Sequence, residues 1–380
     1  MLFELSEEQL MIQQAARDFA QTELKPGVIE RDEHQKFPKE QIKKLGELGF
    51  LGMMVDPKYN GSGMDSVSYV LVMEELSKID ASASVVVSVN NSLVCYGLEA
   101  YGNEAQKEKY LKPLASGEKI GAFCLSEPEA GSDATSQQTT AEDMGDYYLL
   151  NGTKNWITNG STASTYLVIA QTHKELRHKG INAFIVEAGT PGFTIGPKEN
   201  KLGIRGSDTH SLMFNDVKVP KENRIGDDGF GFSFAMKTLE GGRIGIAAQA
   251  LGIAAGAYEL ALEYSKQRKS FGKPISDHQA ISFKLADMAT QIEAARMLVY
   301  KAAWLKDQGQ SYTLAGSMAK LFASKVAMDV TVEAVQIHGG YGFVKEYHVE
   351  RLMRDAKITQ IYEGTSEIQK MVISRSILSK

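Results

Sequence analysis

The chain has few cysteines and lacks the common metal-binding motifs. Its 380 residues include only two cysteines, Cys95 and Cys124, which form no CxxC, and its seven histidines form no HExxH. We therefore expect no disulfide framework, no structural metal and a reducing compartment. The start of the sequence lacks a basic n-region and an Arg-rich transit pattern, and the longest apolar stretch, around 244–257, falls short of the ~20 residues that span a bilayer. We expect no membrane insertion and a cytoplasmic bacterial protein, or a mitochondrial matrix protein if a presequence has been removed.

Neither sign of charge dominates, and several frequent nucleotide-binding motifs are missing. The 42 basic and 47 acidic residues give a net charge of −5, so the sequence shows no basic face for nucleic acid. No GxGxxG lies between a strand and a helix; residues 229–231 and 339–342 come nearest. A GxSxG elbow and a Walker A loop are also missing. These absences give no support to a nicotinamide enzyme of the Rossmann type, an α/β-hydrolase or a P-loop NTPase.

The pattern of the first 118 residues is helical. The length of the chain predicts two or three domains, and no repeat of ~20–50 residues is evident. Ser6 followed by Gln9 is typical of a capping box, in which side chains satisfy free N–H groups at a helix start. The first helix is expected to stop at Pro26, and further helices are expected at 38–49, 67–78, 83–101 and 104–117.

The pattern changes twice after residue 118. Short extended segments predict strands at Tyr147–Leu150, Thr165–Gln171, Ile181–Glu187, Phe193–Pro197 and His210–Val219, with a turn at Asn151-Gly152. Long helical runs then return at 229–267, 278–308, 312–338 and about 364–378, and helices of this length favour an up-down bundle. The predicted fold class is α+β: an N-terminal all-α domain (1–118), a middle β-domain built as a barrel or sandwich (119–225) and a C-terminal four-helix bundle (226–380).

Three segments carry the candidate chemistry. They are FCLSEPEAGSD at 123–133, NGTKNWITNG at 151–160 and QIYEGTSEIQ at 360–369. Taken alone, Ser126 would be a turn cap and Trp156 a core residue of the β-domain. Together and in this order, the three segments resemble the acyl-CoA dehydrogenase family over about the whole chain. Residues 90–93, 201–206 and 242–252 point to its short-chain, butyryl-CoA branch.

The resemblance implies an FAD cofactor and a set of ligand-binding residues. The implied FAD-binding residues are Phe123, Leu125, Ser126, Gly131, Ser132, Trp156, Ile157, Thr158, Arg268, Phe271, Gln279, Gln336, Ile337, Gly339, Gly340, Thr365 and Glu367. The implied residues for the acyl-CoA are Ser132, Glu240, Arg243 and Gly364. Short-chain relatives usually have Asp at the position of Glu240. In the family, Gln279 and 336–340 reach the adenine half of FAD from a neighbouring subunit, which implies a homotetramer built as a pair of dimers. His338 is interpreted as a packing residue.

Glu363 is the candidate base. Removing the proton next to a thioester needs a base, and a carboxylate in a dry site can have a pKa of ~6–7. The resemblance implies that Glu363 takes the α-proton, that its N–H and an FAD hydroxyl hold the thioester oxygen, and that the β-hydrogen leaves as hydride, giving a trans-2-enoyl-CoA. One branch of the family carries the base at the position of Gly242, which here has no side chain. The alternative for Glu363 is an acid favoured by a helix dipole.

Other functions remain as alternatives on the same scaffold. The resemblance implies electron-transferring flavoprotein as the partner that accepts the electrons, whereas an acyl-CoA oxidase would pass them to oxygen. The length of 380 residues favours the dehydrogenase. A short branched-chain acyl-CoA is the second expectation for the substrate, after butyryl-CoA. A non-enzymatic helical scaffold is the distant alternative, and the presence of Glu363, Arg268 and Trp156 argues against it.

Overall fold

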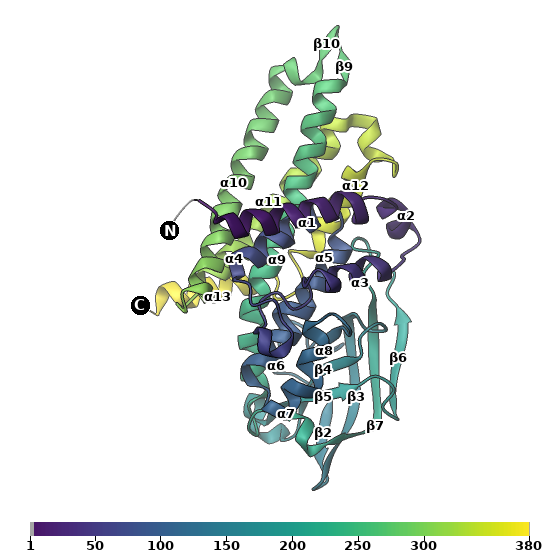
Figure 1. Cartoon of the computed structure of the whole chain (residues 1–380), viewed down its shortest axis with the longest axis vertical. Coiled ribbons are helices and arrows are strands. Elements are labelled where there is room, and N and C mark those ends of the chain that lie inside the picture. The colour runs from purple at the N-terminus through teal and green to yellow at the C-terminus, as the bar shows by residue number, and fades with distance from the viewer. Residues whose placement is uncertain (1–3, 380) are drawn as a thin grey trace.

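The computed structural model describes residues 4–379 and places a β-sheet between two helical parts of the chain (Figure 1). Helices precede the sheet in sequence, and long helices follow it. The fold class expected from the sequence is therefore confirmed. The sheet lies at one end of the molecule, and the long helices extend away from it toward the other end.

The N-terminal part contains short helices around two almost wholly buried ones, α4 and α5. The first helix begins as predicted: Ser6 Oγ accepts a hydrogen bond from the Gln9 N–H at 3.1 Å, and the Gln9 side chain accepts one from the Ser6 N–H. The elements are α1 (Glu7–Phe19), η1 (Ala20–Leu24), α2 (Val28–Glu33), α3 (Lys39–Glu47), η2 (Pro57–Tyr59), α4 (Ser66–Ser77), α5 (Ala81–Ser88), η3 (Val89–Cys95), α6 (Tyr96–Tyr101), α7 (Glu104–Gln106), η4 (Lys107–Leu111) and α8 (Lys112–Ala115).

The sheet has eight strands in the order β6-β7-β3-β2-β4-β5-β8, and β1 pairs with β4 in parallel. Most other pairs are antiparallel, and the longest, β3 with β7, contains two register shifts. The elements are β1 (Gly121–Cys124), β2 (Thr140–Asp143), β3 (Tyr147–Thr158), β4 (Thr165–Gln171), η5 (Lys174–Gly180), β5 (Ile181–Glu187), β6 (Phe193–Lys198), β7 (Thr209–Pro220), η6 (Lys221–Asn223) and β8 (Arg224–Ile225).

The turn expected at Asn151-Gly152 was a wrong prediction. Both residues lie inside β3, where the pairing with β7 shifts register between Leu150 and Gly152. Gly152 has φ +147°, and a Cβ there would lie 2.6 Å from the Thr139 Cα. Glycine is therefore required for close backbone approach at a bulge, and the chain does not reverse direction there.

The C-terminal part is built on α9, which packs along α4, α10 and α11. A short hairpin, β9–β10, joins α9 to α10 at the end of the molecule farthest from the large sheet (Figure 1). Helices α12 and α13 pack against α11. The elements are α9 (Gly231–Gln267), β9 (Lys269–Ser270), β10 (Lys273–Pro274), η7 (Ile275–Asp277), α10 (Gln279–Asp307), α11 (Thr313–His338), η8 (Gly339–Phe343), α12 (His348–Ile358) and α13 (Ser366–Leu378).

Glycines let α9 lie against α4. A Cβ at Gly252 or Gly256 would collide with a backbone carbonyl oxygen at the C-terminal end of α4 or just after it.

By length and composition alone, two helical stretches could cross a membrane, Ala81–Tyr101 and Gly231–Gln267, both longer than the apolar run at 244–257. Their apolar windows are 94% and 83% buried inside the fold, so they are core helices here.

A buried ion pair fixes the loop that follows β1. Lys154 Nζ on β3 lies 2.6 Å from Glu127 Oε1, and the two side chains are 0% and 1% exposed. Lys154 also donates to the Leu125 carbonyl at 3.1 Å, and the Glu127 carboxylate accepts the backbone N–H groups of Gln138 and Thr139. The pair therefore ties β3 to both ends of this loop.

Glu127→Ala is expected to lower the free energy of unfolding by about 3–5 kcal/mol, because it leaves the Lys154 ammonium buried without its partner. Asp143→Ala is the matched control, because it removes an ion pair with Lys221 in which both side chains are nearly half exposed. The control should cost no more than about 1 kcal/mol. Urea unfolding of both variants measures the difference, and equal losses would contradict the role of the buried pair.

Candidate active site

Glu363 lies in the loop between α12 and α13 with a left-handed backbone conformation. Its φ is +51°, and the φ of Gly364 is +93°. Side chains rarely adopt this conformation, and such strain concentrates at functional sites. The carboxylate oxygen Oε2 is buried and has no hydrogen-bond partner among residues 4–379. A buried oxygen without a partner is costly, so its presence requires an explanation beyond packing.

Gly242 on α9 leaves the space that this carboxylate occupies. A Cβ at position 242 would collide with Glu363 Oε2 and would lie 2.8 Å from Leu93 Cδ2. A side chain at 242 and the carboxylate of Glu363 therefore exclude one another. The geometry gives a physical reason why a chain with glycine at 242 can carry its acid at 363.

Burial and two cations control the protonation of Glu363. Burial raises its pKa to about 7, while the charges of Lys320 and Arg243 act in the opposite direction. Burial also lowers the pKa of Lys320 to about 8 and lowers the pKa of Arg243. Burial raises the pKa of Tyr69 on α4, and the charge of Glu363 adds to that rise. The carboxyl group can thus accept and release a proton near neutral pH.

Neighbouring side chains hold the loop from both sides of Glu363. Lys320 Nζ donates to the Gly364 carbonyl oxygen at 2.7 Å, and Gln369 Nε2 donates to the same oxygen at 3.0 Å. The hydroxyl of Tyr362 donates to Gln249 Oε1 on α9. The loop that bears Glu363 is therefore attached to α9, α11 and α13.

The sequence analysis missed Lys320 and Gln369. Lys320 lies on the face of α11 that also buries Ala319, Ala323 and Ala327. A lone lysine on an apolar helical face is the signal that could have drawn attention to it, since lysine is rarely buried without a partner. Gln369 carries no such signal, because its role depends on the loop before α13.

The second cluster of expected residues lies where the loop after β1 meets the end of β3. Trp156 has φ +58° at the second register shift of β3, and its side chain is 58% exposed, so it is not a core residue. The Asn155 N–H donates to the Ser126 carbonyl at 2.9 Å, which joins the two segments. A Cβ at Gly131 would have no neighbour within 4 Å. The Ile157 side chain is buried in the β core, so only its backbone can face a ligand.

The expected FAD residues at 268–279 and 336–340 lie far from Glu363. The guanidinium of Arg268 lies over the Tyr341 ring at 5.5 Å, and the two help to line a hollow of about 560 Å³ with Ile337, Gly339 and Gly340. Phe271 in the adjacent hairpin is 96% exposed. His338 stacks on Tyr264 with ring centroids 4.2 Å apart, as expected of a packing residue. Gln279 and Gln336, both exposed, belong to the same end of the molecule.

The length of α9 separates the two groups. Gly242 lies next to Glu363, and Arg268 follows the last residue of the helix. At 1.5 Å per residue, these two positions are about 40 Å apart along the axis. The structure does not bring Arg268 or Phe271 to Glu363. One chain by itself therefore presents two separate groups of expected residues, one at Arg268 and one around or beside Glu363, the latter consisting of Glu240, Arg243, Gly364, Thr365 and Glu367.

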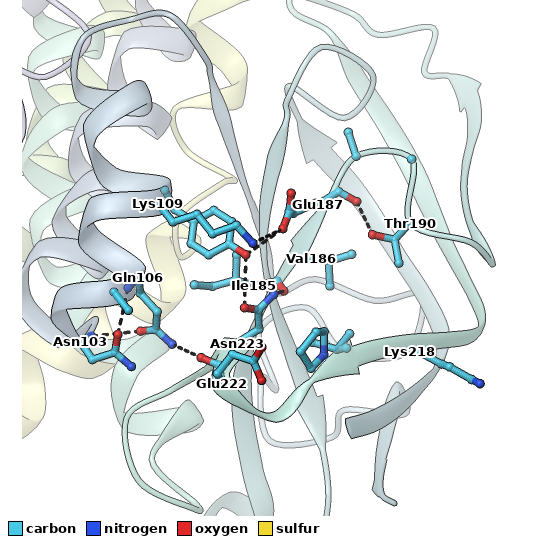
Figure 2. Close-up of a pocket in the computed structure, with 16 residues that line it drawn as sticks. Asn103, Gln106, Lys109, Ile185, Val186, Glu187, Thr190, Lys218, Glu222 and Asn223 are labelled. Atoms are coloured by element: carbon cyan, nitrogen blue, oxygen red, sulfur yellow. Dashed lines mark hydrogen bonds and ion pairs between the residues drawn. The ribbon is translucent and has the colours of Figure 1, made fainter. Parts of the chain in front are cut away.

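Another cleft, of about 490 Å³, lies between the helical segment 104–111 and the sheet, and contains none of the expected site residues (Figure 2). Its polar groups bind one another. Tyr110 Oη donates to Glu187 Oε1 at 2.9 Å, and Gln106 Nε2 donates to the Glu222 carbonyl at 2.8 Å. We interpret this cleft as the contact between the N-terminal helices and the sheet.

Comparisons with known proteins match nearly the whole chain. Three family models match in order: the N-terminal domain of acyl-CoA dehydrogenase at residues 6–118, its middle domain at 122–217 and its C-terminal domain at 229–378. The short-chain specific acyl-CoA dehydrogenase of Clostridium acetobutylicum is 53% identical over 375 residues, covering 99% of each chain.

Two solved structures have the same fold over their full length. The butyryl-CoA dehydrogenase of Megasphaera elsdenii has a TM-score of 0.98 and 54% identity, covering 100% of both chains. A chain in a structure described as the electron transferring flavoprotein of Acidaminococcus fermentans has a TM-score of 0.99 and 53% identity, also over 100% of both chains. The chain described here therefore belongs to the acyl-CoA dehydrogenase family of oxidoreductases, whose members use FAD.

Proposed function

We propose that this protein dehydrogenates a short-chain acyl-CoA, first of all butyryl-CoA, to the trans-2-enoyl-CoA, with Glu363 as the base. The observation that carries the proposal is the buried, unpaired carboxylate oxygen of Glu363 against Gly242. The similarity to short-chain specific relatives and to a butyryl-CoA dehydrogenase supports the choice of substrate. A short branched-chain acyl-CoA is the second candidate.

The chain's own residues supply a base and positive charge. Glu363 would accept the proton from the carbon next to the thioester, and its pKa of about 7 suits that task at neutral pH. The backbone N–H of Glu363 has no acceptor among residues 4–379, so it can donate to the thioester oxygen as negative charge develops there. Arg243 and Lys320 lie close enough to lower the cost of that charge. When bound, FAD supplies the acceptor for the β-hydrogen.

The residues that would hold FAD fit such a ligand. The exposed Trp156 ring, the backbone of Ile157 and the open position at Gly131 form one partial site, with hydroxyls at Ser126, Ser132 and Thr158 nearby. Arg268 at the far end offers a permanently charged fork for a phosphate. Because Arg268 is about 40 Å along α9 from Gly242, which adjoins Glu363, a complete site needs Arg268 and Phe271 from a second copy.

We propose accordingly a homotetramer made of two dimers, with three domains per chain at 1–118, 119–225 and 226–380. The full-length match to a chain from the Acidaminococcus fermentans structure supports electron-transferring flavoprotein as the acceptor in place of oxygen. We propose the cytoplasm of a bacterium as the location.

Glu363→Gln is expected to stabilise the folded protein at high pH. The pKa of Glu363 is about 7 in the folded state against an ordinary value of 4.5 in the unfolded chain, so above pH 7 both states carry the charge and its burial opposes folding. Below pH 4.5 both states are protonated and this cost vanishes. Without acyl-CoA, the variant should gain roughly 2–3 kcal/mol at pH 8 and almost nothing near pH 4.5, measured by urea unfolding at both pH values. A pH-independent difference would contradict a raised pKa.

The same substitution is expected to lower turnover of butyryl-CoA by roughly 10²–10⁴-fold, because an amide cannot take the α-proton. Flavin absorbance and melting temperature report whether the variant still folds and binds FAD. Glu40→Gln, on the exposed first turn of α3, is the matched control and should retain most of the activity. Near-normal turnover by the Glu363 variant would reject it as the base.

The choice of acyl chain is tested by anaerobic bleaching of the flavin. We expect butyryl-CoA to bleach the flavin faster than hexanoyl-, octanoyl- or isobutyryl-CoA at equal concentration. Faster bleaching by isobutyryl-CoA would transfer the assignment to a branched substrate. Rapid formation of hydrogen peroxide in air during turnover would favour the oxidase, and a colourless protein without bleaching would favour a scaffold.

A further inference from the structure

Lys320 is a fully buried cation whose only hydrogen bond within residues 4–379 goes to the loop that bears Glu363. Its side chain is 0% exposed, and its ammonium donates to the Gly364 carbonyl oxygen at 2.7 Å. Its ammonium and the Glu363 carboxylate influence one another's protonation, although they form no ion pair within 4.0 Å. The ammonium therefore contacts the backbone of Gly364, the residue after Glu363, and makes no direct contact with the carboxylate.

Lys320 contacts the second of two consecutive residues with left-handed backbone conformations. Glu363 and Gly364 both have positive φ, and the Gly364 carbonyl accepts from Lys320 and Gln369 together. The two donors come from different helices, α11 and α13. A left-handed pair of residues persists only where the surroundings hold it, and these two hydrogen bonds provide that hold.

A buried lysine is an expensive way to make this contact. Removing an ammonium from water costs several kcal/mol, and a neutral side chain could hold a carbonyl at lower cost. Gln369 makes a hydrogen bond of that neutral kind to the same oxygen. The positive charge of Lys320 therefore has an effect that a second amide would not provide.

The charge acts on a small set of groups around Glu363. Arg243 reaches the carboxylate from α9, Tyr69 from α4 and Tyr362 from the same loop. Glu367 on α13 is exposed and lies on the side of Lys320. Arg243 and Lys320 are thus the two cations that favour the ionised form of Glu363. Of these two, only Lys320 also donates a hydrogen bond to the backbone of the loop that bears Glu363.

We propose that Lys320 is a positioning residue for the base, holding the left-handed Glu363–Gly364 pair through the Gly364 carbonyl and placing a positive charge near the carboxylate. This inference rests on the proposed role of Glu363. Lys320 sets where the carboxylate lies and at which pH it is ionised, and it does not exchange a proton with the substrate.

The test compares Lys320→Met with Gln369→Leu in the holoenzyme with butyryl-CoA. Lys320→Met removes both the hydrogen bond and the charge. We expect kcat to fall roughly 10–100-fold and the acidic limb of the pH profile of kcat/KM to move up by about 1 pH unit, because the pKa of Glu363 rises when the opposing cation is lost. Gln369→Leu removes the hydrogen bonds from Nε2 to the Glu363 and Gly364 carbonyls but no charge, so kcat should fall while the pH profile stays in place.

Lys325→Met is the matched control on the same helix. Its ammonium is exposed and pairs with Asp329, so kcat and the pH profile should not change. Lys320→Arg keeps the charge and is expected to keep the pH profile even where kcat falls. Exchange of the substrate's α-hydrogens in D2O, followed by mass spectrometry, measures the proton step separately and should slow in Lys320→Met. Flavin content and melting temperature identify variants that fail to fold, and Lys320→Gln then replaces Lys320→Met.

The outcomes separate the two proposals. An inactive Glu363→Gln beside a Lys320→Met or Lys320→Gln variant with unchanged kcat and pH profile overturns the role of Lys320 alone. An active Glu363→Gln overturns the proposed base and this inference with it. A loss of kcat with an unmoved pH profile also overturns the inference, because it shows a structural lysine whose charge does not reach the base.

Discussion

The site depends on one carboxylate whose buried oxygen Oε2 has no hydrogen-bond partner within residues 4–379. Glu363 carries its side chain on a left-handed backbone, and its Oε2 lies where Gly242 leaves room. Burial alone would keep this acid neutral at pH 7, and the cations Lys320 and Arg243 offset part of that effect. At a pH near its pKa, a carboxyl group can both accept and release a proton, as a base adjacent to a thioester must do.

Helix α9 connects this carboxylate to the rest of the architecture. Its glycines allow close contact with α4 and with Glu363, and its far end carries Arg268 beside the hollow lined by Gly339 and Gly340. The helix is too long for one chain to bring both ends to a single ligand. A long core helix that separates Glu363 from Arg268 makes a second copy of the chain part of the proposed function.

Local sequence signals predicted local structure well. The Ser6–Gln9 capping box is present, and the long helices α9, α10 and α11 lie within about two residues of their expected bounds. The turn at Asn151-Gly152 failed because the same residue pair that favours a hairpin also suits a bulge, and only the packing of Thr139 against Gly152 distinguishes them. Helix α12 was not anticipated, although it leads directly into the loop of the base.

The sequence by itself determined the family, the fold class and the identity of the candidate acid, since these follow from residues contiguous in short motifs. The tertiary structure decided what surrounds that acid. Lys320 and Gln369 reach the Gly364 carbonyl from different helices, and Gly242 is required because a side chain there would occupy the space of the carboxylate. Burial, charge and steric exclusion between distant segments arise only when the chain has folded, and they set the pKa on which the proposed chemistry depends.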